Sequence, residues 1–207
     1  YWGEPKLVFV KARSCVLGDG VKTLLFSGGL DSTVLFHMLL EIYGAKGFCA
    51  VSVDYGQPHV AEVDAARALC EENGVEWRLI SLRDVFQVNP SGLLLGSADL
   101  SVPKETVVKN RNAIFVTAVS AFSDVIFLGC NKDDYGDYYD CRPEYLATLS
   151  FVLGVRVKSP LQEMTKSEIV CRAKEYGVDL ARVVTCYLGT GCGACASCDL
   201  LARALDD

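Results

Sequence analysis

Apolar positions along the chain follow two alternating patterns. Short, nearly continuous apolar runs are typical of strands buried on both faces, and they alternate with longer segments whose apolar residues recur at helical spacing. This alternation predicts an α/β fold in which a five-stranded parallel sheet carries helices on both faces. The expected strands are residues 21–27, 47–56, 75–82, 124–131 and 155–161, and the expected helices are residues 32–43, 59–74, 110–122, 142–154 and 165–177.

Local signals mark several boundaries of these elements. Thr165 stands three residues before Glu168, the spacing of a capping box, and Gly177 ends the same helix. Residues 83–109 show no clear period and are expected to form a long loop of the kind that serves as a lid or binding element. Because ligands bind at the carboxyl ends of parallel strands, we expect the site in the loops after Phe26, Val53, Leu82, Leu128 and Val157.

Composition indicates one globular domain. Of the 207 residues, 51% are apolar and 22% are charged, which is enough to build a substantial core. We expect an N-terminal extension or edge element at 1–20, the α/β domain at 21–178, and a C-terminal segment packed on the same domain at 179–207. Apolar runs stay below the roughly 18 residues that cross a bilayer, and the first residues lack a signal-peptide pattern. These features predict a cytoplasmic protein without a membrane partner.

The charge balance bears on the class of partner. Acidic residues outnumber basic ones by 26 to 20, which gives a formal net charge of −6, and Lys and Arg form no extended block. Affinity for nucleic acid comes largely from basic side chains that release counterions from phosphates. The sequence therefore favours a small-molecule partner over direct binding of nucleic acid.

The segment "SGGLDS", residues 27–32, lies between the first expected strand and the first expected helix. Backbone N–H groups at the beginning of a helix form an anion site, and glycines allow the close approach of phosphate oxygens. Ser27 and Ser32 add hydroxyl groups to this site. The segment fits neither a Walker A loop nor a G-x-G-x-x-G motif. A plain strand–helix turn with Asp31 as the N-cap is the alternative, but it leaves the second glycine and the serines unexplained.

Cysteines occur in two settings. Four of them near the C-terminus have the spacing C-x5-C-x2-C-x2-C, which suits a tetrahedral, structural Zn²⁺ site. A disulfide or a redox-active pair is the alternative for this cluster of Cys186, Cys192, Cys195 and Cys198. The remaining cysteines stand alone in apolar segments, where we expect buried free thiols: Cys15, Cys49, Cys70, Cys130, Cys141 and Cys171.

The segment Ser-Gly-Gly-x-Asp-Ser after the first strand resembles the PP-loop of the ATP pyrophosphatases, whose fold is adenine nucleotide alpha hydrolase-like. Three further clusters follow in order: "VDYGQPH" at 53–59, "KNRNAIF" at 109–115 and "GCNKDDYGDYYDCRPEYL" at 129–146. Together with the terminal cysteines, they make the chain similar, from about residue 21 to 203, to the 7-cyano-7-deazaguanine synthase family.

The resemblance implies an enzyme that adenylates the carboxylate of 7-carboxy-7-deazaguanine with ATP and Mg²⁺, adds ammonia to form an amide, and activates it again to give the nitrile. It also implies a Zn²⁺ in the cysteine cluster, and it leaves a homodimer open. Two alternatives remain, a ligase that joins the carboxylate to a protein or other amine and stops at the amide, and a non-catalytic nucleotide-binding relative.

The residues that match the family's motifs fall into three groups. The nucleotide would contact Phe26, Ser27, Gly28, Gly29, Leu30, Asp31, Ser32 and Thr33. Asp31, Ser32 and Lys166 would take part in the chemistry, although Lys166 also fits a solvated helix lysine. The substrate would contact Tyr55, Gln57, Arg111, Asn112, Asp137, Tyr138, Asp140 and Arg142, each of which also fits a surface or capping position, and Tyr139 is a further candidate for stacking.

Overall fold

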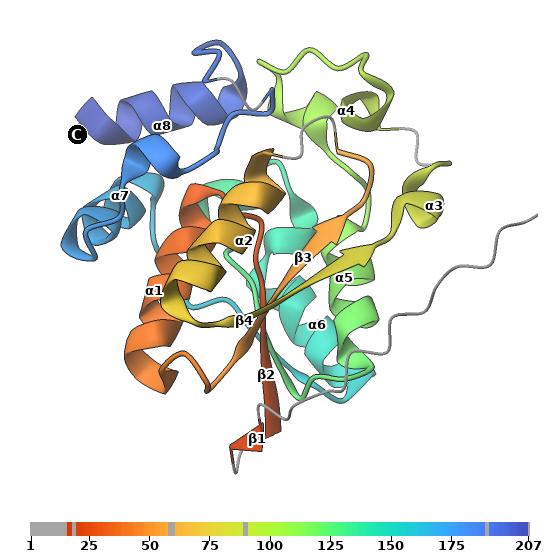
Figure 1. Cartoon of the computed structure of the whole chain (residues 1–207). Coiled ribbons are helices and arrows are strands. Elements are labelled where there is room, and N and C mark those ends of the chain that lie inside the picture. The colour runs from red at the N-terminus through yellow and green to blue at the C-terminus, as the bar shows by residue number, and fades with distance from the viewer. Residues whose placement is uncertain (1–15, 18–19, 58–60, 89–90, 189–190, 207) are drawn as a thin grey trace, which may run out of the picture.

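The structure is a computed structural model, and it describes residues 16–17, 20–57, 61–88, 91–188 and 191–206 (Figure 1). Five strands form a parallel sheet in the order β4-β3-β2-β5-β6. The strand β2 lies at the centre, where Thr23 pairs with Cys49 on one side and with Ile126 on the other. The bounds are β2 Gly20–Leu25, β3 Cys49–Asp54, β4 Glu76–Ser81, β5 Val125–Phe127 and β6 Arg156–Lys158.

Helices cover both faces of this sheet. Successive residues of β2 point to opposite faces, so Leu24 belongs to one buried cluster and Leu25 to another. The Leu24 cluster contains apolar residues of α1, α2, α7 and α8, and the Leu25 cluster contains those of α5 and α6. The helices have the bounds α1 Leu30–Tyr43, α2 Ala61–Asn73, α5 Arg111–Ser120, α6 Pro143–Leu153, α7 Lys166–Glu175 and α8 Ala196–Asp206.

The predicted α/β fold with a five-stranded parallel sheet is confirmed, although strands are shorter than expected and a further helix is present. The strand β5 ends at Phe127 rather than near residue 131, where the Ser159 hydroxyl shares its one proton between the carbonyl oxygens of Leu128 (2.9 Å) and Cys130 (2.8 Å). The strand β6 likewise ends at Lys158 rather than at residue 161. The helix α8 was not expected, and it places Leu201 and Ala204 against the core cluster that includes α7.

The stretch 83–109 lacks a long helix, as expected, but it is not without structure. It contains three short helical turns, α3 Arg83–Phe86, α4 Gly92–Leu95 and the 3₁₀ turn η1 Pro103–Thr106. They gather around a small third cluster of Phe86, Leu93 and Val108. This cluster fixes the stretch over the edge of the sheet that carries the loops after β2 and β3 (Figure 1).

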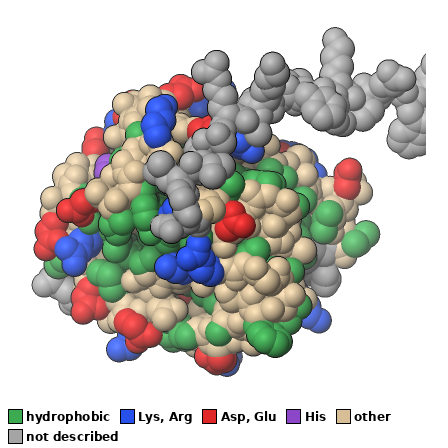
Figure 2. Space-filling view, turned by 90° about the horizontal axis from the view of Figure 1, so that it is seen from below, with side chains coloured by type: hydrophobic (Ala, Val, Ile, Leu, Met, Phe, Trp, Pro, Cys, Tyr) green, Lys and Arg blue, Asp and Glu red, His purple; other side chains and the backbone are tan. Residues whose placement is uncertain are grey.

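The N-terminal prediction falls mostly outside the described residues. Within it, β1 Val16–Leu17 pairs antiparallel with the beginning of β2, and the division of the chain at 20 and 178 stays a prediction. Figure 2 views the molecule from the β1 end, and among the described residues there the basic and acidic side chains are interspersed. No helix within the described ranges is long and apolar enough to cross a membrane.

The scattered cysteines agree with prediction at four positions, Cys49, Cys70, Cys130 and Cys141, which are buried. The prediction is wrong for Cys171, which is exposed. Cys171 stands on α7 directly after Ile169 and Val170, which face the core, so the helical rotation turns its side chain outward. Cys15 lies outside the described residues.

Candidate active site

The PP-loop, residues 27–32, leads from β2 into α1, and its glycines have different functions. Gly28 has a φ of +87°, and a Cβ there would stand 2.2 Å from the carbonyl oxygen of Glu62 on α2. Gly29 has a φ of −75°, and a Cβ there would meet nothing closer than 3.4 Å. Gly28 therefore has a backbone conformation that favours glycine, whereas Gly29 has one that other residues adopt as well.

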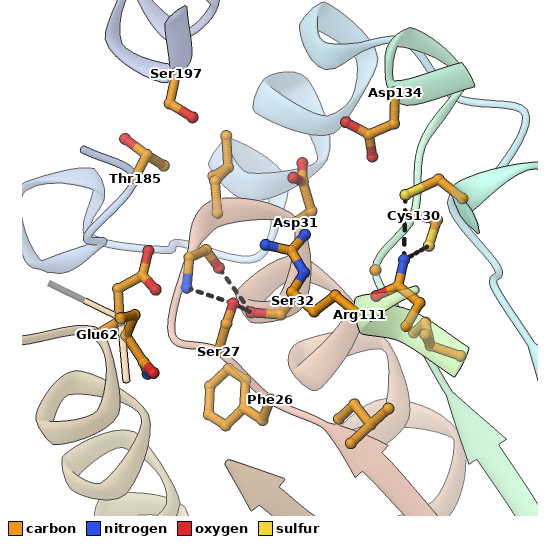
Figure 3. Close-up of a pocket in the computed structure, with 18 of the residues that line it drawn as sticks. Phe26, Ser27, Asp31, Ser32, Glu62, Arg111, Cys130, Asp134, Thr185 and Ser197 are labelled. Carbon is orange, nitrogen blue, oxygen red and sulfur yellow. Dashed lines mark hydrogen bonds between the residues drawn. The ribbon is translucent and has the colours of Figure 1, made fainter. Parts of the chain in front are cut away.

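Two serine hydroxyls brace the PP-loop. The Ser27 and Ser32 hydroxyls lie 2.9 Å apart, the Gly29 N–H donates to Ser27 Oγ at 3.2 Å, and the Ser32 hydroxyl approaches the Gly29 carbonyl oxygen at 3.0 Å (Figure 3). Gly29 is the N-cap of α1, so the alternative of Asp31 as N-cap is not what the structure has. The N–H groups of the first turn of α1 remain available for an anion.

A hydrogen-bond relay holds the beginning of the PP-loop in place. Ser52 Oγ donates to the carbonyl oxygen of Phe26 at 2.7 Å, and the indole N–H of Trp77 donates to Ser52 Oγ at 2.9 Å. The Phe26 N–H also donates to Val51 O at 2.9 Å. The residue before the loop is thus fixed by β3 and β4 together.

Lys166 reaches the PP-loop from the first turn of α7. Its Nζ lies 2.6 Å from Oδ1 and 2.7 Å from Oδ2 of Asp31, and its backbone N–H donates to Asp133 Oδ2 at 2.7 Å. The Lys166 side chain is only 12% exposed. Burial alone would lower its pKa, but the carboxylates of Asp31 and Asp134 raise the pKa above its ordinary value. Lys166 is therefore held charged, and the description of a solvated helix lysine does not fit.

The PP-loop and Lys166 border a cavity of about 280 Å³ at the carboxyl ends of the central strands. Figure 3 shows its side chains converging from several elements. Among the predicted residues, the lining includes Phe26, Ser27, Gly29, Leu30, Asp31, Ser32, Tyr55, Gln57, Arg111, Asn112, Tyr138 and Lys166. The sequence analysis did not single out Ser52, Glu62, Thr106, Asp134, Thr185, Tyr187 and Ser197, which also line it.

Arg111 presents its guanidinium to this cavity beside an aromatic wall. It lies 5.9 Å from the ring centroid of Tyr55 and donates a long hydrogen bond of 3.5 Å to the Tyr55 hydroxyl. Tyr55 in turn contacts Phe86 and Phe115, with ring centroids 5.5 Å and 5.3 Å apart. Among the described residues no carboxylate forms an ion pair with Arg111. Its charge is available for an anionic ligand.

Two cavity carboxyl groups have a raised pKa. Burial raises the pKa of Glu62 to about 7, against the opposing effect of Arg111. Burial, reinforced by the charge of Asp31, raises the pKa of Asp134 to about 6. The position of each residue in the sequence could have indicated a place in the site, because Glu62 lies in the first helical turn after β3 and Asp134 in the first turn after β5. Acids at such places are also common as helix caps, so sequence alone does not single them out.

The structure places five of the predicted contacts outside the cavity lining. The carboxylate of Asp140 is buried and accepts the Asn112 N–H at 3.0 Å, so it holds the beginning of α5. Arg142 is exposed and donates from Nε to the Tyr135 carbonyl oxygen at 2.8 Å. In this geometry Asp140 and Arg142 shape the loops around the cavity, and direct contact with a ligand stays a prediction for Gly28, Thr33, Asp137, Asp140 and Arg142.

Three distant loops close over the cavity through a chain of hydroxyl groups. The Thr106 hydroxyl donates its proton to Pro103 O at 2.7 Å. It therefore accepts a hydrogen bond from the Tyr138 hydroxyl, which lies 2.8 Å away. The Tyr138 hydroxyl then accepts from that of Tyr187 at 3.0 Å. Tyr187 directly follows Cys186, so the cysteine segment contributes to the wall of the cavity.

The four C-terminal cysteines come together in space. The sulfur atoms of Cys186, Cys192, Cys195 and Cys198 all lie within 4.8 Å of one another, and the N–H groups of Leu188 and Cys192 approach Cys186 Sγ at 3.3 and 3.4 Å. A single tetrahedral Zn²⁺ with Zn–S bonds of about 2.3 Å requires sulfurs about 3.8 Å apart. The cluster fits one metal ion, whereas a four-iron cluster spaces its thiolates more widely because each binds a different iron.

The sheet order and the loop between β2 and α1 define a PP-loop protein of the adenine nucleotide alpha hydrolase-like class. The fold is similar to that of the U34-tRNA thiolase NcsA from Methanococcus maripaludis, which has a [4Fe-4S] cluster, with a TM-score of 0.54 and 20% identity over 91% of this chain and 72% of that one. It is also similar to NMN synthetase from Francisella tularensis, with a TM-score of 0.51 and 16% identity over 80% of this chain and 64% of that one. Identities this low concern the fold alone.

Within this class, the family model described as queuosine biosynthesis protein QueC matches residues 22–207, and the chain belongs to that family. The 7-cyano-7-deazaguanine synthase of Geotalea daltonii is 38% identical over 86% of this chain and 88% of its own length. The synthase of Thiobacillus denitrificans is 38% identical over 86% of this chain and 89% of its own length. The synthase of Saccharophagus degradans is 35% identical over 89% of this chain and 92% of its own length. The resemblance found in the sequence is confirmed.

Proposed function

We propose that this protein uses ATP and ammonia to convert 7-carboxy-7-deazaguanine into 7-cyano-7-deazaguanine. The observation that carries the proposal is one cavity that joins a phosphate-binding loop to Arg111, which has no carboxylate partner among the described residues, and to the aromatic wall at Tyr55. A planar purine-like base with a carboxylate suits this pair, because a ring can stack on tyrosine and a guanidinium binds carboxylates. The relatives named above carry the same activity in their names.

The chemistry has two activations. A carboxylate oxygen of the substrate attacks the α-phosphorus of ATP, and pyrophosphate leaves from the PP-loop. Ammonia then adds to the acyl carbon, AMP leaves, and the amide forms. The amide oxygen attacks the α-phosphorus of a second ATP, pyrophosphate leaves and the nitrogen loses a proton. Loss of AMP and of the second proton on nitrogen then gives the nitrile.

Several residues of the chain suit these steps. The N–H groups at the beginning of α1 and the hydroxyls of Ser27 and Ser32 would bind the phosphates. Lys166, held charged beside Asp31, would offset the negative charge that develops on them. Mg²⁺ bound with ATP supplies further charge neutralisation, and Asp134 offers a carboxylate in the cavity that is not ion-paired to Lys166. Zn²⁺ in the cysteine cluster would fix the Tyr187 segment.

Product identification by mass spectrometry tests the proposal. The protein is incubated with ATP, Mg²⁺, 7-carboxy-7-deazaguanine and ammonium, and the nitrile, AMP and pyrophosphate are expected. Accumulation of the amide alone, or coupling of the substrate to a protein amine, would contradict nitrile formation and favour an amide-forming ligase. No substrate-dependent release of AMP would indicate a non-catalytic relative. Ammonia as the nitrogen donor, a homodimer and a cytoplasmic location stay predictions.

A further inference from the structure

Glu62 lines the cavity beside the PP-loop. It belongs to the first turn of α2, and its Oε1 lies 3.9 Å from the position that a Cβ on Gly29 would occupy. Figure 3 shows the carboxyl group between the PP-loop and Thr185, whereas Asp134 approaches from the other side. The carboxyl group therefore stands beside the loop at which the adenylate would form.

The other carboxyl groups around the cavity have partners. Asp31 is ion-paired with Lys166, Asp134 accepts the Asn131 N–H at 3.1 Å, and Asp140 accepts the Asn112 N–H. Within the described parts of the chain, no hydrogen bond or ion pair involves the Glu62 side chain. Glu62 is half-buried, and a carboxyl group that is partly removed from water without a partner destabilises the folded protein. That cost makes Glu62 a candidate for a chemical role.

Amine addition requires a base near the acyl carbon. Ammonia is mostly ammonium at neutral pH, and the nitrogen that attacks must lose protons as the C–N bond forms and AMP departs. We infer that Glu62 is the general base of the amine-addition step of the proposed function, on which this inference rests. Its carboxylate takes one proton from ammonium to give ammonia, and the ammonia nitrogen forms the C–N bond. The second proton leaves with AMP as the bond between the acyl carbon and the AMP oxygen breaks.

The environment of Glu62 suits this task. Its pKa is raised to about 7 by burial, while Arg111 on α5 lowers the pKa and Cys186 in the cysteine segment raises it. Tyr55 also interacts electrostatically with Glu62. A base whose pKa lies near the operating pH can accept a proton in one step and release it in the next. Partial protonation also limits repulsion between this carboxyl group and the phosphates of ATP.

The experiment separates adenylation from amine addition in the full-length protein. Substrate-dependent exchange of pyrophosphate into ATP is measured without ammonia, and amide plus nitrile is measured with ammonium. For Glu62→Gln we expect exchange close to that of the unchanged protein and a loss of about 100-fold or more in product formation with ammonium. Hydroxylamine, which is largely unprotonated at neutral pH, is expected to restore the rate, with a hydroxamate as the product.

Asp64→Asn is the matched control, because Asp64 lies in the same turn of α2 and is exposed. It should leave both reactions unchanged. An equal loss of exchange and product formation in Glu62→Gln, or failure of hydroxylamine to restore the rate, would overturn the role of Glu62. If the unchanged protein shows no exchange, the proposed function itself fails. Normal product formation by both the unchanged protein and Glu62→Gln contradicts only the role of Glu62.

Discussion

The ammonium group of Lys166 is clamped between both carboxylate oxygens of Asp31, at 2.6 and 2.7 Å. The two residues are 135 positions apart in the sequence, and each lies in the first turn of its helix, α7 and α1. The Thr165–Glu168 capping box sets the beginning of α7, with Glu168 N–H donating to Thr165 Oγ1 at 3.3 Å. A local capping motif thus places a distant charge at the PP-loop.

Replacement of this lysine is the first test of the site. Lys166→Met is expected to lower ATP-dependent product formation by at least about 100-fold, because the charge that offsets the phosphates is lost. It is also expected to lower the melting temperature, because Asp31 loses its partner. Lys174→Met, an exposed change in the last turn of the same helix, is the control and should have no such effect. Steady-state kinetics with near-normal rates in Lys166→Met would refute the assignment.

Replacement by alanine should have different effects at the two glycines of the PP-loop. Gly28→Ala places a Cβ 2.2 Å from the Glu62 carbonyl oxygen at a φ of +87°, so we expect a loss of at least about 2 kcal/mol in the free energy of unfolding. Gly29→Ala has space and an ordinary φ, so we expect a change below about 1 kcal/mol and a raised KM for ATP. Urea unfolding and ATP titration measure the two effects, and similar stability of both variants would contradict the geometry.

Metal content tests the cysteine cluster. We expect about one Zn²⁺ per chain by elemental analysis, since four thiolates complete a tetrahedral site. Cys192→Ser is expected to lose the metal and to lower the melting temperature, because binding of a structural metal contributes to folding. Cys171→Ser removes an exposed thiol outside the cluster and should retain the metal. Iron in place of zinc, or retention of metal by Cys192→Ser, would contradict the prediction.

Stability should depend on pH through Glu62. Its pKa rises from 4.5 to about 7 on folding, so within that window the folded state binds a proton that the unfolded state has lost. The free energy of unfolding therefore falls as the pH rises through this window. Glu62→Gln should flatten this dependence and stabilise the protein above neutral pH by at most about 3 kcal/mol. Denaturant unfolding at several pH values, with Asp64→Asn for comparison, measures this pH dependence of the free energy of unfolding. An unchanged dependence in Glu62→Gln would disprove the contribution of Glu62.

The fold was predictable because its signals are local. The apolar runs of β2 and β3, the glycine after the first strand and the capping box at Thr165 each act within a few residues, and parallel sheets place ligands at one edge. The helix α8 was missed because it begins inside the cysteine motif, although Leu201 and Ala204, which rest on the core next to α7, already have helical spacing in the sequence. The end of β5 lies where the hydroxyl of Ser159, 31 residues away in the sequence, donates to the carbonyl oxygen of Leu128.

The features of the candidate site also fall into those that local sequence predicts and those that depend on residues far apart in the chain. Sequence by itself determined the PP-loop, the cysteine spacing and the family to which the chain belongs, because these are carried by residue types at fixed short separations. Only the tertiary structure decided that Asp140 supports Asn112 rather than lining the cavity, that Lys166 is clamped by Asp31, and that Glu62 extends into the cavity without a partner among the described residues. Burial, charge and hydrogen bonding at these positions arise from residues far apart in the chain, so they exist only after the sheet brings those residues together.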